Sequence, residues 1–139
     1  MARAFTVETT IAHPTDDVWA ALTDWDRAHL WMGVDWVRAD GDTEEGMTLT
    51  FQTRNREHTS TITHLTSGRS ITLRSTQGGA TADYTYRLEP IDPATTLVTL
   101  DADCTLSGLW RAGGPLLRVA MKRTDGGQLE ALADVVAAE

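Results

Sequence analysis

The chain has 139 residues, with 20 acidic side chains against 12 basic ones and a formal net charge of −8 at pH 7. Apolar residues make up 41% and charged residues 23% of the chain, which is typical of an ordinary globular domain. The acidic balance argues against nucleic-acid binding, because phosphate contacts need clustered Lys and Arg, and Lys122 is the only lysine. We expect one domain spanning residues 1–139, which is long enough to bury a core.

Cysteine content and hydropathy suggest where the protein resides. Cys104 is the only cysteine, so an internal disulfide framework is excluded. The first residues contain no apolar signal core, and no run approaches the ~18 apolar residues that a membrane span needs. We therefore expect a cytoplasmic protein without a membrane span. Its oligomeric state stays open, although homodimers are common among soluble proteins.

The first predicted elements are a strand and two short helices. Apolar and polar residues alternate over residues 5–11, as in a half-buried strand. Thr15 follows Pro14 and precedes two carboxylates, which predicts a helix with Thr15 as N-cap. Asp24 is positioned to cap a second short helix over residues 25–31.

The middle of the chain is rich in threonine: 15 of its 22 threonines lie within residues 46–105. β-Branched residues favour pleated strands, and period-2 alternation within this block predicts about six strands. Glycine, proline and asparagine between the alternating runs indicate short turns. The block is therefore expected to form an antiparallel meander with one polar and one apolar face.

A long helix is predicted at the end of the chain, from Pro115 to about residue 137. It would be about 35 Å long at ~1.5 Å per residue and would have to cross the whole sheet. Gly126-Gly127 falls inside it, where each glycine costs about 1 kcal/mol relative to alanine. Two interpretations are open: a bend that shapes the mouth of a cavity, or a tolerated irregularity that breaks the helix in two. The positions of the helical stripe are Leu117, Met121, Thr124, Gln128, Leu132 and Val135.

Several residues stand at characteristic places along this order of elements: residues 5–19, Leu22 to Trp25, Trp31, Gly46, residues 86–90, residues 96–99, Leu129 and Leu132. This order, together with these residues, resembles the SRPBCC (START/pollen-allergen-like) superfamily, in particular its polyketide cyclase/dehydrase and lipid-transport branch. The resemblance implies an α+β helix-grip fold, in which a seven-stranded antiparallel sheet wraps around a long C-terminal helix. Two short helices would follow the first strand, and an apolar cavity would lie between sheet and helix. Members of the superfamily include polyketide cyclases, lipid and hormone carriers, and chaperone activators, and the fold does not decide among them.

Strand register predicts which side chains face this cavity, because residues two apart lie on one side of a strand. If Ile62 points inward, then His58, Ser60 and His64 share its face. Trp110 lies in a segment that resembles the flexible loop guarding the cavity mouth in this fold. The expected ligand-binding residues are Met47, Leu49, Phe51, Ser60, Ile62, Ile71, Leu73, Ser75, Trp110, Leu117, Met121, Thr124 and Gln128.

Three side chains are candidates for catalysis. His58 can act as a base or an acid at neutral pH, and Tyr84 or Tyr86 could donate a hydrogen bond to a substrate carbonyl or enolate. The alternatives are that His58 and His64 are solvated near turns and that both tyrosines belong to the core. We expect no metal site, since the histidines lack ligand spacing, and no cofactor, since dinucleotide and phosphate-binding motifs are missing.

The sequence leaves three functions open. The chain could bind a polyketide- or lipid-like molecule and catalyse its cofactor-free cyclisation or dehydration. It could carry or sense an apolar or aromatic small molecule without changing it. A partner-binding module of the chaperone-activator kind would instead have a collapsed cavity and an exposed apolar patch.

Overall fold

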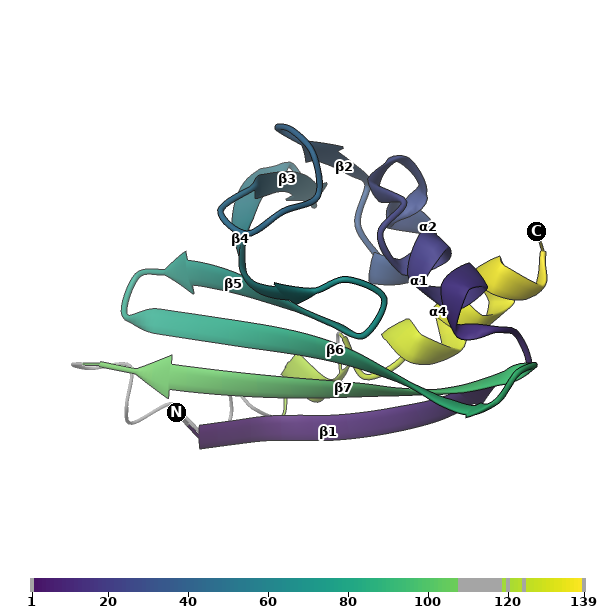
Figure 1. Ribbon diagram of the computed structural model, residues 1–139. Helices are drawn as coiled ribbons and strands as arrows, with labels where there is room; N and C mark the ends of the chain where they lie inside the picture. Colours follow the sequence, from purple (N-terminus) through teal and green to yellow (C-terminus); the bar gives the residue numbers. More distant parts are fainter. Residues whose placement is uncertain (1, 108–118, 120, 124, 139) are drawn as a thin grey trace.

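The computed structural model describes residues 2–107, 119, 121–123 and 125–138, and Figure 1 shows their arrangement. It confirms the α+β helix-grip fold, with short helices after the first strand. The elements are β1 (Ala2–Ile11), α1 (Thr15–Leu22), the single 3₁₀ turn η1 (Trp25–Arg27), α2 (His29–Met32), β2 (Trp36–Ala39), β3 (Thr48–Thr53), β4 (Arg56–Thr66), β5 (Ser70–Gln77), β6 (Ala80–Asp92), β7 (Thr95–Leu106) and α4 (Gln128–Ala137).

The seven strands form one antiparallel sheet in the order β1-β7-β6-β5-β4-β3-β2. In Figure 1 the long strands β1, β7, β6 and β5 form a floor, and the sheet curls upward through β4 toward β3 and β2. The helices α1, α2 and α4 all lie on the inner side of this curve. The curved sheet therefore holds these helices on its concave side.

The two faces of the sheet differ as the alternation predicts. On the outer face Arg74 donates two hydrogen bonds to Asp83, and Arg3 and Arg87 both pair with Asp101. The inner face carries the apolar side chains of the core. Because each strand alternates between a solvated and an apolar surface, the register is fixed wherever the inner face is covered.

A β-bulge in β4 changes the face of one predicted residue. The register with β5 shifts between Ile62 and His64, so Thr63 has no partner of its own. An extra residue turns every later side chain to the opposite face. Leu65 consequently packs against the core, whereas His64 is exposed opposite Thr72. The prediction that His64 shares the face of His58 is wrong.

The short helical segments differ from prediction in detail. Pro14, rather than Thr15, is the N-cap of α1, with an extended backbone at ψ 151° and no side-chain cap bond. Thr15 is the first helical residue, and its hydroxyl lies 3.1 Å from that of Thr96 on β7. The second predicted helix is divided into η1 and α2. Asp24 is the N-cap of η1 but makes no side-chain cap bond.

The C-terminal helix is interrupted at the paired glycines. Residues 121–123 and 125 are helical, Gly126 and Gly127 form a turn, and α4 continues from Gln128. A Cβ at Gly126 would lie 2.5 Å from the backbone oxygen of Lys122, so only glycine fits this close approach. Of the two open interpretations, the break in the helix is observed. The predicted start of the helix at Pro115 lies outside the described residues.

The core fills the end of the curved sheet that α1, α2 and α4 cover. Val18, Leu22 and Trp31 from the helices are buried against β-strand residues, as are Leu129 and Leu132 of α4. The ring of Trp31 packs edge-on against that of Tyr86, with centroids 5.6 Å apart. No helix in the described part of the chain is long and apolar enough to cross a membrane.

Candidate functional site

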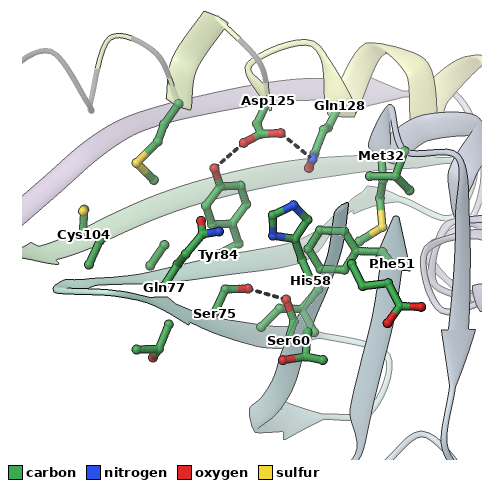
Figure 2. A pocket seen from close by; sticks show the side chains of 18 of the residues that line it. Met32, Phe51, His58, Ser60, Ser75, Gln77, Tyr84, Cys104, Asp125 and Gln128 are labelled. Carbon is green, nitrogen blue, oxygen red and sulfur yellow. Dashed lines mark hydrogen bonds between the residues drawn. The ribbon is translucent and has the colours of Figure 1, made fainter. Parts of the chain in front are cut away.

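A cavity of about 480 Å³ remains at the other end of the sheet, between the inner faces of the strands and the C-terminal helical residues. Apolar atoms make up most of its surface, although eleven of its 19 lining residues carry polar side chains. An apolar surface with hydrogen-bonding groups set into it suits a small-molecule site. Figure 2 shows Ser60 and Ser75 on the strand side of the cavity and Asp125 and Gln128 on its helical side. The lining residues are Met32, Val34, Phe51, Glu57, His58, Thr59, Ser60, Leu73, Ser75, Thr76, Gln77, Ala80, Ala82, Tyr84, Tyr86, Cys104, Met121, Asp125 and Gln128.

Many of the predicted site residues lie together around this cavity. The three candidates for catalysis, His58, Tyr84 and Tyr86, all line it. They come from β4 and β6, which the curl of the sheet and the intervening β5 bring to one concave surface. The predicted ligand-binding residues that also line the cavity are Phe51, Ser60, Leu73, Ser75, Met121 and Gln128.

Four predicted lining residues belong instead to the core. Met47, Leu49, Ile62 and Ile71 face inward but are at most 5% exposed and do not line the cavity. They lie at the end of the sheet that the helices cover. Ile71, for example, pairs with Tyr86, against which Trp31 packs. Register predicts their face correctly but not whether a helix covers them. Trp110, Leu117 and Thr124 lie outside the described residues.

His58 stacks on Phe51 at one side of the cavity. The two residues are paired in register between β3 and β4, and their rings lie 5.4 Å apart with an angle of 25° between their planes. His58 is partly exposed, and no hydrogen bond joins its ring nitrogens to any described residue. The imidazole is thus held by stacking, with its nitrogens available to a ligand or to water.

A hydrogen-bonded cluster of four side chains closes the opposite side of the cavity. The Tyr84 hydroxyl donates to Asp125 Oδ2, and the Tyr86 hydroxyl donates to Gln128 Oε1 at 2.5 Å. Gln128 Nε2 in turn donates to Asp125 Oδ1 at 3.3 Å. Both tyrosines line the cavity from β6, two residues apart, while Asp125 and Gln128 flank the glycine turn. Figure 2 shows the hydroxyl of Tyr84 directed at Asp125. The cluster ties the sheet to the C-terminal helix.

Burial dominates the electrostatics of this cluster. It raises the pKa of Asp125, although the hydrogen bonds from Tyr84 and Gln128 act in the opposite direction. Burial, reinforced by the charge of Asp125, also raises the pKa of Tyr84 and of Tyr86. Both phenols are therefore neutral at physiological pH, and their protons are already committed to protein acceptors.

The serine pair supplies a second polar feature. Ser60 Oγ and Ser75 Oγ lie 2.5 Å apart across β4 and β5. One hydroxyl donates to the other, so the second hydroxyl retains a proton that it can donate to a ligand. Near the far end of the lining, Cys104 pairs with Ala82 across β6 and β7 and is buried. This buried cysteine also lines the cavity.

Asp125 is the main site residue that the sequence reasoning missed. The apolar stripe placed Thr124 on the inner side, whereas the structure aligns Met121, Asp125 and Gln128. These residues are spaced by four and then three positions, which also places side chains on one face of a helix. An acidic residue at this spacing was the signal in the sequence that could have identified Asp125. Among the described residues, no three His, Cys, Asp or Glu side chains are grouped as metal ligands.

Comparisons with known proteins agree on the fold. The model of a family described as polyketide cyclase / dehydrase and lipid transport matches residues 2–137. A search of curated proteins found no match. Among similar solved structures, the Zhui aromatase/cyclase from Streptomyces sp. R1128 is 18% identical with a TM-score of 0.75, and the match covers 96% of this chain and 92% of that chain. A START superfamily protein from Mycobacterium smegmatis is 14% identical with a TM-score of 0.77, covering 96% of this chain and 97% of that chain. A truncated norcoclaurine synthase from Thalictrum flavum is 13% identical with a TM-score of 0.70, covering 98% of this chain and 96% of that chain.

Proposed function

Because the chain belongs to the polyketide cyclase/dehydrase and lipid-transport family, we propose that it binds an apolar or aromatic, polyketide-like molecule in the cavity between sheet and helix. The observation that carries the proposal is the open, mainly apolar cavity of about 480 Å³. Its volume falls within the ~300–1,000 Å³ typical of small-molecule sites. A partner-binding module would not need such a space.

We further propose that the bound molecule is cyclised without a cofactor, with His58 as the proton-transfer group. A neutral imidazole nitrogen would remove a proton from the carbon between two ketide carbonyls. The resulting enolate carbon would attack a third carbonyl, farther along the same chain, forming a C–C bond. The imidazolium would return its proton to the new alkoxide, or to the hydroxyl that leaves as water in a dehydration.

The serine pair is better placed than the tyrosines to stabilise the enolate. The hydroxyl protons of Tyr84 and Tyr86 are held by Asp125 and Gln128, whereas one hydroxyl of Ser60 and Ser75 is free to donate. A donor fixed beside a developing oxyanion lowers the barrier, since it stabilises charge that appears only in the transition state. We therefore propose the serine pair as the oxyanion donor and the tyrosines as part of the cavity wall.

A second candidate function is a carrier or sensor that leaves its ligand unchanged. The observation that favours it is the cluster of Tyr84, Asp125, Gln128 and Tyr86, in which both tyrosine protons are held by protein acceptors. Such a wall can contact a ligand without supplying a group that takes part in a reaction.

A thermal-shift screen with aromatic polyketides, fatty acids and sterols tests these functions. A ligand at 100 times its Kd stabilises the folded protein by about 2.7 kcal/mol, a shift of several degrees in Tm. Hits are then incubated with wild type, His58→Ala and His64→Ala, and products are followed by mass spectrometry. The exposed His64 is the matched control. Conversion lost only in His58→Ala supports the enzyme, binding without conversion supports the carrier, and an absence of hits refutes both.

A further inference from the structure

We propose that the cluster of Tyr84, Asp125, Gln128 and Tyr86 is a specificity element that selects ligands with a hydrogen-bond donor, a hydroxyl or an ammonium group, directed at Asp125. Ligands that direct a carboxylate at the same wall are disfavoured. The inference rests on the proposed function, since it presumes that the cavity binds a small molecule.

The count of donors and acceptors in the cluster leads to this inference. Each tyrosine hydroxyl has one proton, and both protons are already donated, to Asp125 and to Gln128. Gln128 Nε2 donates one of its two protons to Asp125 and so retains one. Each carboxylate oxygen of Asp125 accepts one bond from a described residue and can accept another. The cluster therefore offers a ligand mostly acceptor lone pairs.

The position of Asp125 makes those lone pairs accessible to a ligand. Asp125 lines the cavity directly, and Figure 2 shows its carboxylate at the edge of the space above the Tyr84 ring. A buried carboxylate is most stable with several hydrogen bonds or a cationic neighbour. A donor on the ligand would meet this requirement by adding to the two hydrogen bonds that the described residues supply to Asp125.

The charges of the described lining residues also favour a hydrogen-bond donor over a carboxylate on the ligand. Its ionisable groups besides the tyrosines and Cys104 are His58, Glu57 and Asp125, and none of the described lining residues is a lysine or an arginine. A carboxylate that entered next to Asp125 would lose its hydration and face a like charge. Burial also raises the pKa of Asp125, although the hydrogen bonds from Tyr84 and Gln128 act in the opposite direction.

A matched series of naphthalene derivatives tests the proposal. Naphthalene, naphthol, naphthylmethylamine and naphthoic acid, substituted at the same ring position, share one apolar body and differ in the group presented. Their affinities are measured by isothermal titration calorimetry at neutral pH with wild type, Asp125→Asn and Asp134→Asn. Asp134 is exposed on α4, so its variant removes the same charge outside the cavity.

Wild type should bind naphthol and naphthylmethylamine at least about tenfold more tightly than naphthoic acid, as expected for one hydrogen bond to a charged group. Asp125→Asn should weaken the amine most, because its charge partner is lost. It should weaken naphthol less, because an amide oxygen still accepts. Asp134→Asn should leave the order unchanged.

The outcomes separate this inference from the function on which it rests. Equal binding of all four probes, or tighter binding of naphthoic acid, would overturn the specificity proposal while leaving the cavity function intact. If no probe binds, both proposals fail. Should Asp125→Asn not fold, the order of affinities in wild type alone still decides the question.

Discussion

The buried bond between Tyr86 and Gln128 offers a direct test of the hydrogen-bonded cluster. Tyr86 is 1% exposed and Gln128 is 7% exposed. Tyr86→Phe keeps the ring that packs against Trp31 and removes only the hydroxyl that donates to Gln128 Oε1. The variant therefore changes hydrogen bonding without creating a large cavity.

The expected cost follows from the environment of the acceptor. A typical intramolecular hydrogen bond contributes about 0.5–1.5 kcal/mol to stability, and a buried acceptor left without a partner costs about 1–3 kcal/mol. We expect Tyr86→Phe to lower the free energy of unfolding by about 1–3 kcal/mol. With a urea m-value of about 2 kcal/mol/M, the unfolding midpoint should fall by about 0.5–1.5 M.

Urea unfolding followed by far-UV circular dichroism measures this change, and a double-mutant cycle identifies its cause. In a Gln128→Met background the acceptor is gone, so adding Tyr86→Phe should cost less than about 0.5 kcal/mol. The reasoning is refuted if Tyr86→Phe unfolds at the same urea concentration as wild type. It is also refuted if the substitution costs the same in both backgrounds.

Two further predictions concern the glycine turn and the tyrosines. Gly126→Ala should destabilise the protein by about 1–3 kcal/mol, because its Cβ would clash with the Lys122 carbonyl, whereas Gly127→Ala meets open space and should be nearly neutral. Equal urea midpoints for these two variants would contradict the close approach. In an alkaline titration followed by tyrosinate absorbance, neither of the two tyrosines should ionise near pH 10 while the protein is folded, since burial raises both pKa values. The folded pKa values lie above the unfolded ones, so the stability contributed by the tyrosines is complete below about pH 10 and is lost above it. A native titration with a midpoint near 10 would show that the phenols are exposed.

Much of the fold can be predicted from the sequence because the signals are local and repeated. Alternation along strands such as Thr48–Thr53 specifies which face is apolar, and the short turns between strands allow only antiparallel pairing. The bulge beside Ile62 escaped prediction, since one extra residue leaves no clear mark in a threonine-rich strand. His64 was consequently assigned to the wrong face.

The candidate site could be predicted only in part, because a cavity forms where no helix covers the inner face of the sheet. Register places Leu49 and Phe51 on the same inner face, yet Leu49 is core and Phe51 lines the cavity. The difference arises from where the helices cover the sheet, which no local pattern specifies. The partnership of Tyr84 with Asp125 joins residues 41 positions apart, from β6 and from the helical residues before the glycine turn. It could not be derived from the spacing within either element.

The central claim, that this cavity is where a small molecule binds, is tested most directly by filling it. Ala82 lies on the cavity lining between Ser75 and Cys104, and Thr81 is the neighbouring residue on the outer face of β6. Naphthol binding is measured by calorimetry for wild type, Ala82→Phe and Thr81→Phe, each first confirmed to be folded. Our account predicts that Ala82→Phe abolishes binding while Thr81→Phe retains the affinity of wild type. Undiminished binding by a folded Ala82→Phe would contradict it.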